Sequence, residues 1–227
     1  MNQNKVIENT ICFVKKTLNG LESGHDWFHI ERVYKNALLI AADENVDEFI
    51  VILGAFLHDI ADAKFHNGDE TIGPKKARQF LESEKVDETI ICHVENIIKH
   101  ISFKNSLDTE PSSAKGKSSE KFSSEELKVV QDADRLDAIG AIGIARCFNY
   151  GGFKNREIYN PDSKPNLNLS KTEYKNSNAP TINHFYEKLL LLKDKMNTKT
   201  GRRIAEKRHQ FMELYLEQFF GEWNGEK

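Results

Sequence analysis

The run from Phe49 to Ala61 is the feature that most constrains how this chain can fold. Its sequence, F-I-V-I-L-G-A-F-L-H-D-I-A, is apolar almost all round a helix, and Asp47 precedes it as a capping residue. A helix without a polar face has to be covered by other helices. The run therefore predicts a helical bundle with this segment in the middle.

The remaining ordered segments also have helical periodicity, and they supply the helices that such a bundle needs. No alternation typical of β-strands extends beyond a few residues, and the chain contains no internal repeat. We therefore predict an all-α fold in a single domain, residues 1–227. The expected helices, besides 49–61, span about 6–18, 26–42, 68–83, 87–101, 124–148, 181–197 and 200–220.

Two polar stretches interrupt this pattern. Residues 104–124 are rich in Ser and Lys and have almost nothing to bury, so we expect a mobile loop. Residues 151–180 are polar and rich in turn-forming residues, and we expect an irregular segment there. The predicted domain therefore has two long loops, with its C-terminal helices at about 181–220.

Composition excludes several classes of protein. The 227 residues carry a formal net charge of −3, which argues against a nucleic acid as the main partner. Three cysteines without paired spacing fit neither a disulfide framework nor a C-x-x-C zinc site. No apolar stretch approaches the ~18 residues of a membrane span, and no leader peptide is evident. We expect a cytoplasmic protein without a membrane partner; a homo-oligomer stays open.

His58 and Asp59 are the first candidates for a functional site. They end the apolar run, and a carboxylate in such a place costs several kcal/mol unless it is paired or binds a metal. A buried His–Asp hydrogen bond that holds two helices together would also explain the pair. Two adjacent ligand-type residues nevertheless favour a metal, because further ligand-type residues face the same interior.

Those further residues come from two other predicted helices. His29 lies beside the apolar stripe of the helix at 26–42, and Asp134 and Asp137 share a stripe with Val130 and Ala141. Two imidazoles and two carboxylates suit a six-coordinate divalent ion better than a closed structural zinc site. Four such ligands would leave two positions for water or substrate, as a metal-dependent hydrolase requires.

Four motifs, in this order and in helical context, resemble the HD-domain metal-dependent phosphohydrolase superfamily. They are G-H-D-W-F-H-I-E-R-V, L-H-D-I-A-D-A-K, Q-D-A-D-R-L-D-A-I-G-A-I-G-I-A-R and Y-G-G-F, between Gly24 and Phe153. More narrowly, the chain is similar to a subgroup of small stand-alone bacterial HD proteins. The resemblance implies an HD-type helical bundle and a phosphohydrolase activity.

The resemblance also implies roles for individual residues. It makes His29, His58, Asp59 and Asp134 the metal ligands, and the stripe agrees with Asp134 in preference to Asp132. With this ligand set we expect Mn²⁺ or Mg²⁺ as the divalent metal ion, with Fe²⁺, Co²⁺, Ni²⁺ and Zn²⁺ as alternatives.

The general base has one candidate. The resemblance makes Asp62, four residues after His58, the expected base, although a solvent-facing carboxylate would explain it equally well. Asp26 is expected to be a helix cap and not a ligand.

Basic residues near these motifs are candidates for binding substrate phosphates, although each is more often a solvated side chain. His93 and His100 lie two turns apart, about 10 Å along a helix, which is too far for both to bind one ion. The basic residues from Arg202 to His209 fit a solvated helix face. The candidates for substrate binding are Lys64, His66, His100, Lys104, Arg135 and Arg146.

We therefore expect a metal-dependent phosphohydrolase that acts on phosphoester or phosphoanhydride bonds of a small phosphorylated substrate, a nucleotide by the resemblance. One alternative is a two-iron oxygenase of the same fold, which would need His93 or His100 for a second metal. Another is a non-catalytic module that senses nucleotides. The chain has no G-x-x-x-x-G-K phosphate loop, which argues against an ATP-driven machine.

Overall fold

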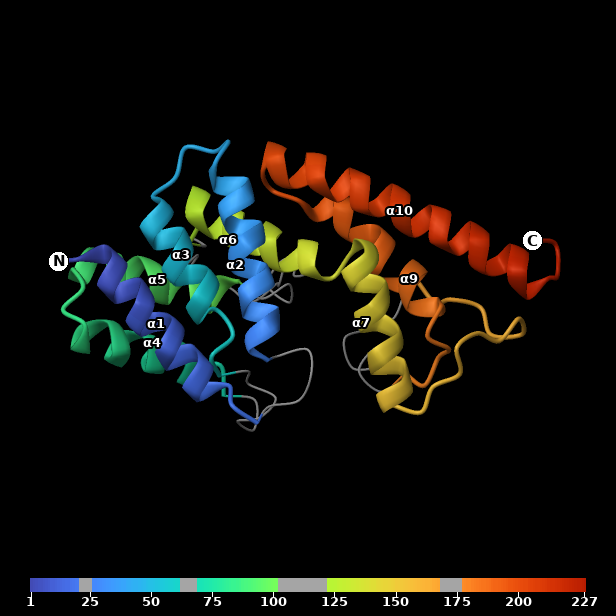
Figure 1. Ribbon diagram of the computed structural model, residues 1–227, viewed down its shortest axis with the longest axis horizontal. Coiled ribbons are helices and arrows are strands. Elements are labelled where there is room, and N and C mark those ends of the chain that lie inside the picture. Colours follow the sequence, from blue (N-terminus) through green and yellow to red (C-terminus); the bar gives the residue numbers. More distant parts are fainter. Residues whose placement is uncertain (21–25, 62–68, 102–121, 168–176) are drawn as a thin grey trace, which may run out of the picture. The chain divides into compact units, whose positions relative to one another are not determined.

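The structure of the chain is a computed structural model, and it describes residues 1–20, 26–61, 69–101, 122–167 and 177–227. Within these ranges the fold is all-α, as predicted, with nine α-helices, one 3₁₀ helix and no strand (Figure 1). The described chain divides into two compact units, Met1–Asp134 and Arg135–Lys227, and the division falls within α6 (Glu125–Asp137). The extent of a single HD-type domain over residues 1–227 stays a prediction.

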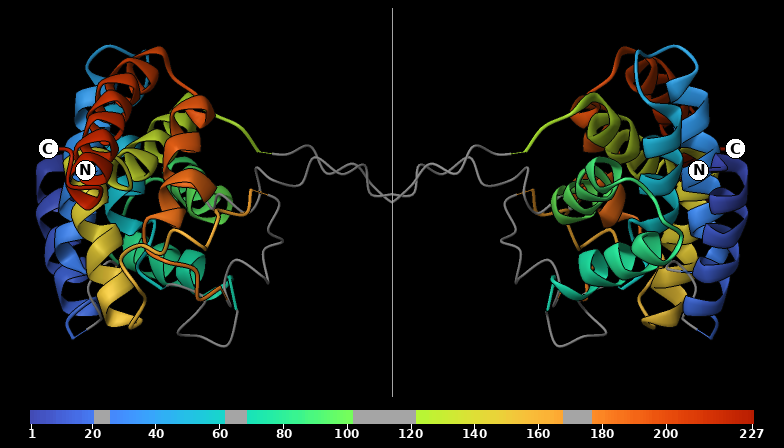
Figure 2. Two further views of the ribbon diagram at one scale, coloured as in Figure 1. Left: turned by 90° about the vertical axis from the view of Figure 1, so that its right-hand side faces the viewer. Right: turned by 90° about the vertical axis from the view of Figure 1, so that its left-hand side faces the viewer.

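The first unit is built around α3 (Glu48–Leu57), the helix that the apolar run predicts. All its residues from Phe49 to Leu57 are buried. It packs against α1 (Gln3–Thr17), α2 (Trp27–Ala41) and α5 (Glu88–His100), and α4 (Ile72–Ser83) lies beside α5 (Figure 2). A helix that is apolar all round therefore occupies the centre of its unit, as the sequence indicates.

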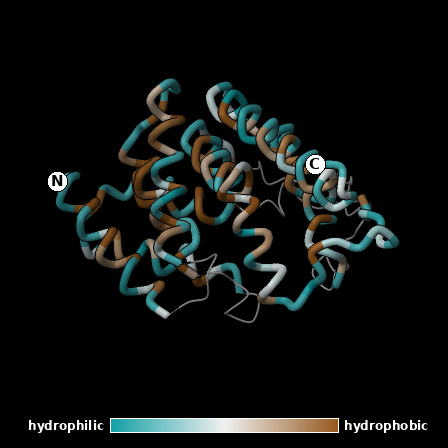
Figure 3. Tube along the Cα trace, turned by 45° about the vertical axis from the view of Figure 1, so that its right-hand side comes forward, coloured by the Kyte–Doolittle hydropathy of each residue, from teal (hydrophilic) through white to brown (hydrophobic). Residues whose placement is uncertain are grey.

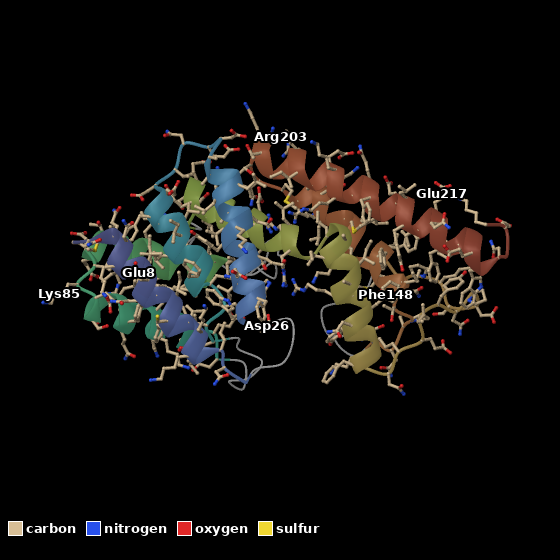
Figure 4. The ribbon with its side chains drawn as sticks, viewed as in Figure 1. Glu8, Asp26, Lys85, Phe148, Arg203 and Glu217 are labelled. Atoms are coloured by element: carbon tan, nitrogen blue, oxygen red, sulfur yellow. The ribbon has the colours of Figure 1, made fainter. Side chains whose placement is uncertain are left out.

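The predicted capping residues begin their helices. Asp26, at the start of α2, accepts a hydrogen bond from the backbone N–H of His29 (Figure 4). Asp47 and Asp87 do the same for α3 and α5, and the hydroxyl of Ser124 accepts from Leu127 N at the start of α6. Each cap satisfies an N–H that lacks a partner within the helix, so each fixes where its helix begins.

The single helix predicted for residues 124–148 is wrong, because the chain forms two helices there. α6 ends at Asp137 and α7 runs from Gly140 to Phe153, with Ile139 extended between them. Gly140 has φ +74°, a conformation that costs residues with a Cβ about 1–2 kcal/mol. The helical periodicity continues through this point, but Gly140 permits the break.

The C-terminal region differs from the prediction in the same way. Residues 181–197 are not one helix: α9 (Asn183–Glu187) is followed by a 3₁₀ helix at Leu189–Lys195, with Lys188 out of helical conformation between them. α10 (Lys199–Trp223) matches its prediction, and hydrophilic and hydrophobic residues alternate along it (Figure 3). The irregular segment starts after Phe153 and not at residue 151. None of the helices in the described ranges combines the length and apolar character of a membrane span.

Candidate metal centre

Three loci in the first unit bring ligand-type side chains together. His29 is in the first turn of α2, His58 and Asp59 follow the last residue of α3, and Asp134 is near the end of α6. Ligand atoms of His29, His58 and Asp59 all lie within 4.8 Å of one another. Oδ1 of Asp134 lies 3.5 Å from Nε2 of His29 and 3.9 Å from Nε2 of His58. The three expected helices therefore meet at one point.

These separations fit a common metal ion. For metal–ligand bonds of about 2.1 Å, neighbouring octahedral ligands lie about 3 Å apart and opposite ones about 4 Å apart. The two distances from Asp134 fall in this range. A buried pair of imidazoles facing a carboxylate at such distances is a donor set that could hold a divalent metal ion.

The imidazoles of His29 and His58 are held in place in different ways. Both rings are largely buried, and they meet edge to face with centroids 5.4 Å apart. Nδ1 of His58 lies 2.8 Å from the carbonyl oxygen of Ala55, which can only accept a hydrogen bond. Nδ1 therefore carries the proton, so Nε2 is the nitrogen that would bind a metal ion. His29 is held through its backbone, whose N–H donates to the cap Asp26 at 3.0 Å.

The environment of α6 differs from the sequence interpretation. The side chain of Asp134 is 41% exposed, whereas Asp132 is completely buried. The prediction that Asp134 faces the interior and Asp132 does not is therefore wrong, because Asp132 is the buried residue of the two and lies about 200° from Asp134 around the helix. The proximity of Asp134 to both imidazoles, and not its burial, makes it the candidate ligand. Asp137, on the same predicted stripe, is buried and forms an ion pair with Arg146.

His93 and His100, on α5, have separate surroundings. Nε2 of His93 lies 2.8 Å from the Ser124 hydroxyl and 3.4 Å from a carboxylate oxygen of Glu126, at the start of α6. Burial opposes ionisation of Glu126, but the hydrogen bond from the Asp47 N–H and the nearby His93 ring bring its pKa below the usual value. His93 therefore joins α5 to the start of α6.

His100 is tied to α6 differently. Its Nδ1 lies 2.8 Å from the carbonyl oxygen of Asn96, and its own carbonyl accepts from the Gln131 side chain at 2.9 Å. Gln131 precedes Asp134 by three residues, so the end of α5 lies one helical turn from that carboxylate on α6.

Arg135 and Arg146, the two arginines predicted to bind substrate phosphate, belong to the second unit. Both form hydrogen bonds to backbone carbonyls of that unit. Arg135 donates to the carbonyl oxygen of Lys195 at 2.5 Å, and Arg146 donates to the carbonyl oxygen of Asp137 at 3.2 Å as well as pairing with its carboxylate. Arg208, which the sequence did not single out, donates to the Leu136 carbonyl at the end of α6. The other predicted site residues, Asp62, Lys64, His66 and Lys104, lie outside the described residues.

The cysteines take no part in this site. All three are free thiols, at positions 12, 92 and 147. Burial raises the pKa of the Cys147 thiol to about 12, so it stays protonated and is a poor nucleophile.

The sequence matches the model of a known protein family. The HD domain model matches residues 27–139, a span that contains all four candidate ligands. YpgQ of Bacillus subtilis is 36% identical over 228 residues, which cover 96% of this chain and 94% of YpgQ. The chain belongs to the HD-domain family.

Solved structures of HD-domain relatives extend the comparison. An HD-superfamily hydrolase from Bacillus thuringiensis is 43% identical, with a TM-score of 0.74 over 98% of this chain and 99% of that one. The structure of Bacillus subtilis YpgQ in complex with ADP is 35% identical, with a TM-score of 0.72 over 96% and 95% of the two chains. By family, the chain is thus an HD-superfamily hydrolase with a candidate His–Asp metal site.

Proposed function

We propose that this chain is a divalent-metal-dependent phosphohydrolase that cleaves phosphoester or phosphoanhydride bonds in nucleotides. The observation that carries the proposal is the cluster of His29, His58 and Asp59, whose ligand atoms lie within 4.8 Å of one another, together with the approach of Asp134 to both imidazoles at 3.5 and 3.9 Å. Support for a nucleotide comes from YpgQ, which was crystallised with ADP. Mn²⁺ and Mg²⁺ are the ions that we favour, with Fe²⁺, Co²⁺, Ni²⁺ and Zn²⁺ as alternatives.

The four ligands have distinct parts in the proposed site. A bound divalent ion would acidify a water molecule and polarise a phosphoryl oxygen. Nε2 of His29 and of His58 supply neutral donors, and the carboxylates of Asp59 and Asp134 balance the charge of the ion. Because the side chain of Asp134 is 41% exposed, its side of the site is accessible to solvent. That is the side from which a charged phosphate could enter.

Other residues would handle protons and phosphate charge. Asp62 is the proposed base that accepts the proton of the attacking water. Lys64, His66 and Lys104 are proposed to neutralise phosphate oxygens, and His100 is proposed to contact them through Nε2. Arg135 and Arg146 are weaker candidates for binding phosphate, because each already donates a hydrogen bond to a backbone carbonyl of the protein.

The oxygenase alternative has less support. It would need His93 or His100 to complete a second metal, and Nε2 of His93 already lies 2.8 Å from Ser124 and 3.4 Å from Glu126, which leaves His100 to supply that ligand. The nucleotide-sensing alternative would keep the same pocket without turnover. Only a measurement of turnover separates it from the proposed hydrolase.

The experiment is a turnover screen on the purified full-length chain. Nucleoside mono-, di- and triphosphates are incubated with Mn²⁺, Mg²⁺, Co²⁺ or Zn²⁺, and released phosphate and pyrophosphate are quantified. The His58→Ala variant, prepared in parallel, reports any contaminating phosphatase. We expect metal-dependent release that the variant lacks. Equal release by the two proteins would refute the proposed hydrolase, and nucleotide binding without turnover would support a sensing module instead.

A further inference from the structure

Asn36 is a buried polar residue that connects two of the helices bearing the proposed ligands. It lies on α2, seven residues after His29, so that both side chains project from the same face of the helix. Only 8% of Asn36 is exposed. Its Nδ2 donates to the carbonyl oxygen of Ala133 on α6 at 3.3 Å.

The carbonyl that Asn36 contacts belongs to the peptide unit that ends in Asp134. Because a peptide unit is planar, the Ala133 oxygen and the Cα of Asp134 move together as one rigid group. A hydrogen bond to that oxygen therefore restrains the backbone from which the Asp134 carboxylate projects. The side chain of Asp134 is 41% exposed, so packing around the carboxylate restrains it less than a buried side chain would be restrained.

We propose that Asn36 is a positioning residue of the metal centre, and this inference rests on the metal site of the proposed function. It holds the α6 backbone at Asp134 in register with the α2 face that carries His29. The 3.5 Å separation of His29 Nε2 and Asp134 Oδ1 is the result of that register. Residues that orient metal ligands in this way commonly change metal affinity by about 10–100-fold when they are replaced.

A purely structural role for Asn36 predicts a different outcome. Ala133 lies inside α6, where a carbonyl normally accepts from the N–H four residues later, so the bond from Asn36 is an additional one. Leucine has the same branched outline as asparagine but is larger, and it makes no hydrogen bond. The Ala133 carbonyl keeps its helical partner when the Asn36 amide is removed, so that acceptor is not left buried without a hydrogen bond and the loss of stability should be small. Asn36→Leu can therefore weaken metal binding while the protein stays fully folded.

The test measures Mn²⁺ affinity by isothermal titration calorimetry on the full-length chain, together with the melting temperature of the metal-free protein. Asn36→Leu and Asn36→Ala are compared with wild type and with Asn9→Ala. Asn9 is a matched control, because its Nδ2 also joins two elements of the first unit, donating to Glu84 at 2.6 Å. We expect a ten- to hundred-fold weaker Kd for both Asn36 variants, with the Asn9 variant within threefold of wild type.

The outcomes separate this inference from the proposed function. If wild type binds Mn²⁺ no better than His58→Ala, the proposed metal site fails and the inference fails with it. If wild type binds Mn²⁺ and both Asn36 variants match its affinity, only the positioning role is refuted. If Asn36→Leu melts early, the comparison rests on Asn36→Ala and Asn9→Ala at a temperature where both are folded. Equal affinities in that pair would also refute the positioning role.

Discussion

His58 donates from Nδ1 to the carbonyl oxygen of Ala55, three residues earlier, at 2.8 Å. Ala55 belongs to the last turn of α3, where backbone carbonyls lack partners within the helix. The imidazole thus satisfies an orphan carbonyl and, by doing so, has its proton fixed on the nitrogen that faces away from the proposed ion. The hydrogen bond at the end of the central helix thus also leaves Nε2 as the nitrogen that would bind the proposed ion.

The first prediction concerns the ligands themselves. We expect His58→Ala, Asp59→Ala and Asp134→Ala each to abolish retention of a divalent ion, because each removes one donor from a set that converges on one point. Metal content per chain, measured by mass spectrometry after purification in Mn²⁺, checks this outcome. Activity in the turnover screen should be lost together with the ion.

Asp132→Asn is the control for that experiment. Asp132 is completely buried, so the change lowers stability, but it leaves the four proposed donors in place. We expect the variant to keep its ion at a temperature where it is folded. An Asp132 variant that loses the ion while the Asp134 variant keeps it would show that the two carboxylates have been assigned in the wrong order.

The sequence predicted the centre of the fold because its signals there were physically unambiguous. The apolar run could only be a buried helix, and Asp26, Asp47 and Asp87 each cap the helix that follows them. The prediction from sequence failed where the helical periodicity continues through a break between two helices, α6 and α7. Nothing in the pattern of apolar residues around Gly140 distinguishes a continuous helix from two helices. The break depends on a conformation that glycine allows but does not require.

The candidate site was partly predictable for a similar reason. The order of the motifs placed ligand-type residues on three helices, and His29, His58 and Asp134 do meet, although Asp134 is partly exposed. Residues that support a ligand give no such signal. Asn36 looked like an ordinary polar residue, although its spacing of seven from His29 placed it on the same helical face. Its partner is a backbone carbonyl, and sequence patterns do not report tertiary contacts to the backbone.

A second prediction decides what Arg146 does. Asp137 is 1% exposed, and Arg146 contacts both its carboxylate and its carbonyl. Arg146→Met leaves a buried carboxylate without this cation, so we expect the free energy of unfolding to fall by about 1–3 kcal/mol, less than for a fully buried pair. Urea denaturation measures it, with Arg202→Met, an exposed arginine that donates to the Met196 carbonyl, as the control. Unchanged stability with a tenfold higher KM would instead assign Arg146 to phosphate binding.

A third prediction concerns stability at mildly acidic pH. Burial, followed by the charges of Lys188 and Arg156, lowers the pKa of His184 to about 3. Above pH 6.5 His184 is neutral whether the chain is folded or not. Between pH 6.5 and about 3 only the unfolded chain takes up this proton, so the free energy of unfolding falls as the pH falls. The loss is on the order of 1 kcal/mol per pH unit.

Replacing His184 by glutamine tests that account. Glutamine does not titrate, so the difference in unfolding free energy between wild type and His184→Gln should change by about 1 kcal/mol between pH 7 and pH 5.5. Urea denaturation at both pH values measures this difference, and the contributions of the other histidines cancel in it. A difference that is the same at both pH values would mean that His184 accepts a proton in the folded state.

The last prediction separates the proposed base from the ligands. α3 ends at Leu57, so the spacing of four between His58 and Asp62 cannot be treated as one turn of a continuous helix. The chain itself still limits the distance between Asp62 and the proposed ligands, since three residues span at most about 11 Å from Asp59.

Asp62→Asn should keep the fold and the ion but lower kcat by about 10²–10⁴-fold, because an amide can hydrogen-bond a water molecule and cannot accept its proton. Metal analysis and steady-state kinetics check both parts, with Glu48→Gln, at the other end of α3, as the matched carboxylate-to-amide control. Activity within a few-fold of wild type would make Asp62 a surface carboxylate, and loss of the ion would make it a ligand or a support for one.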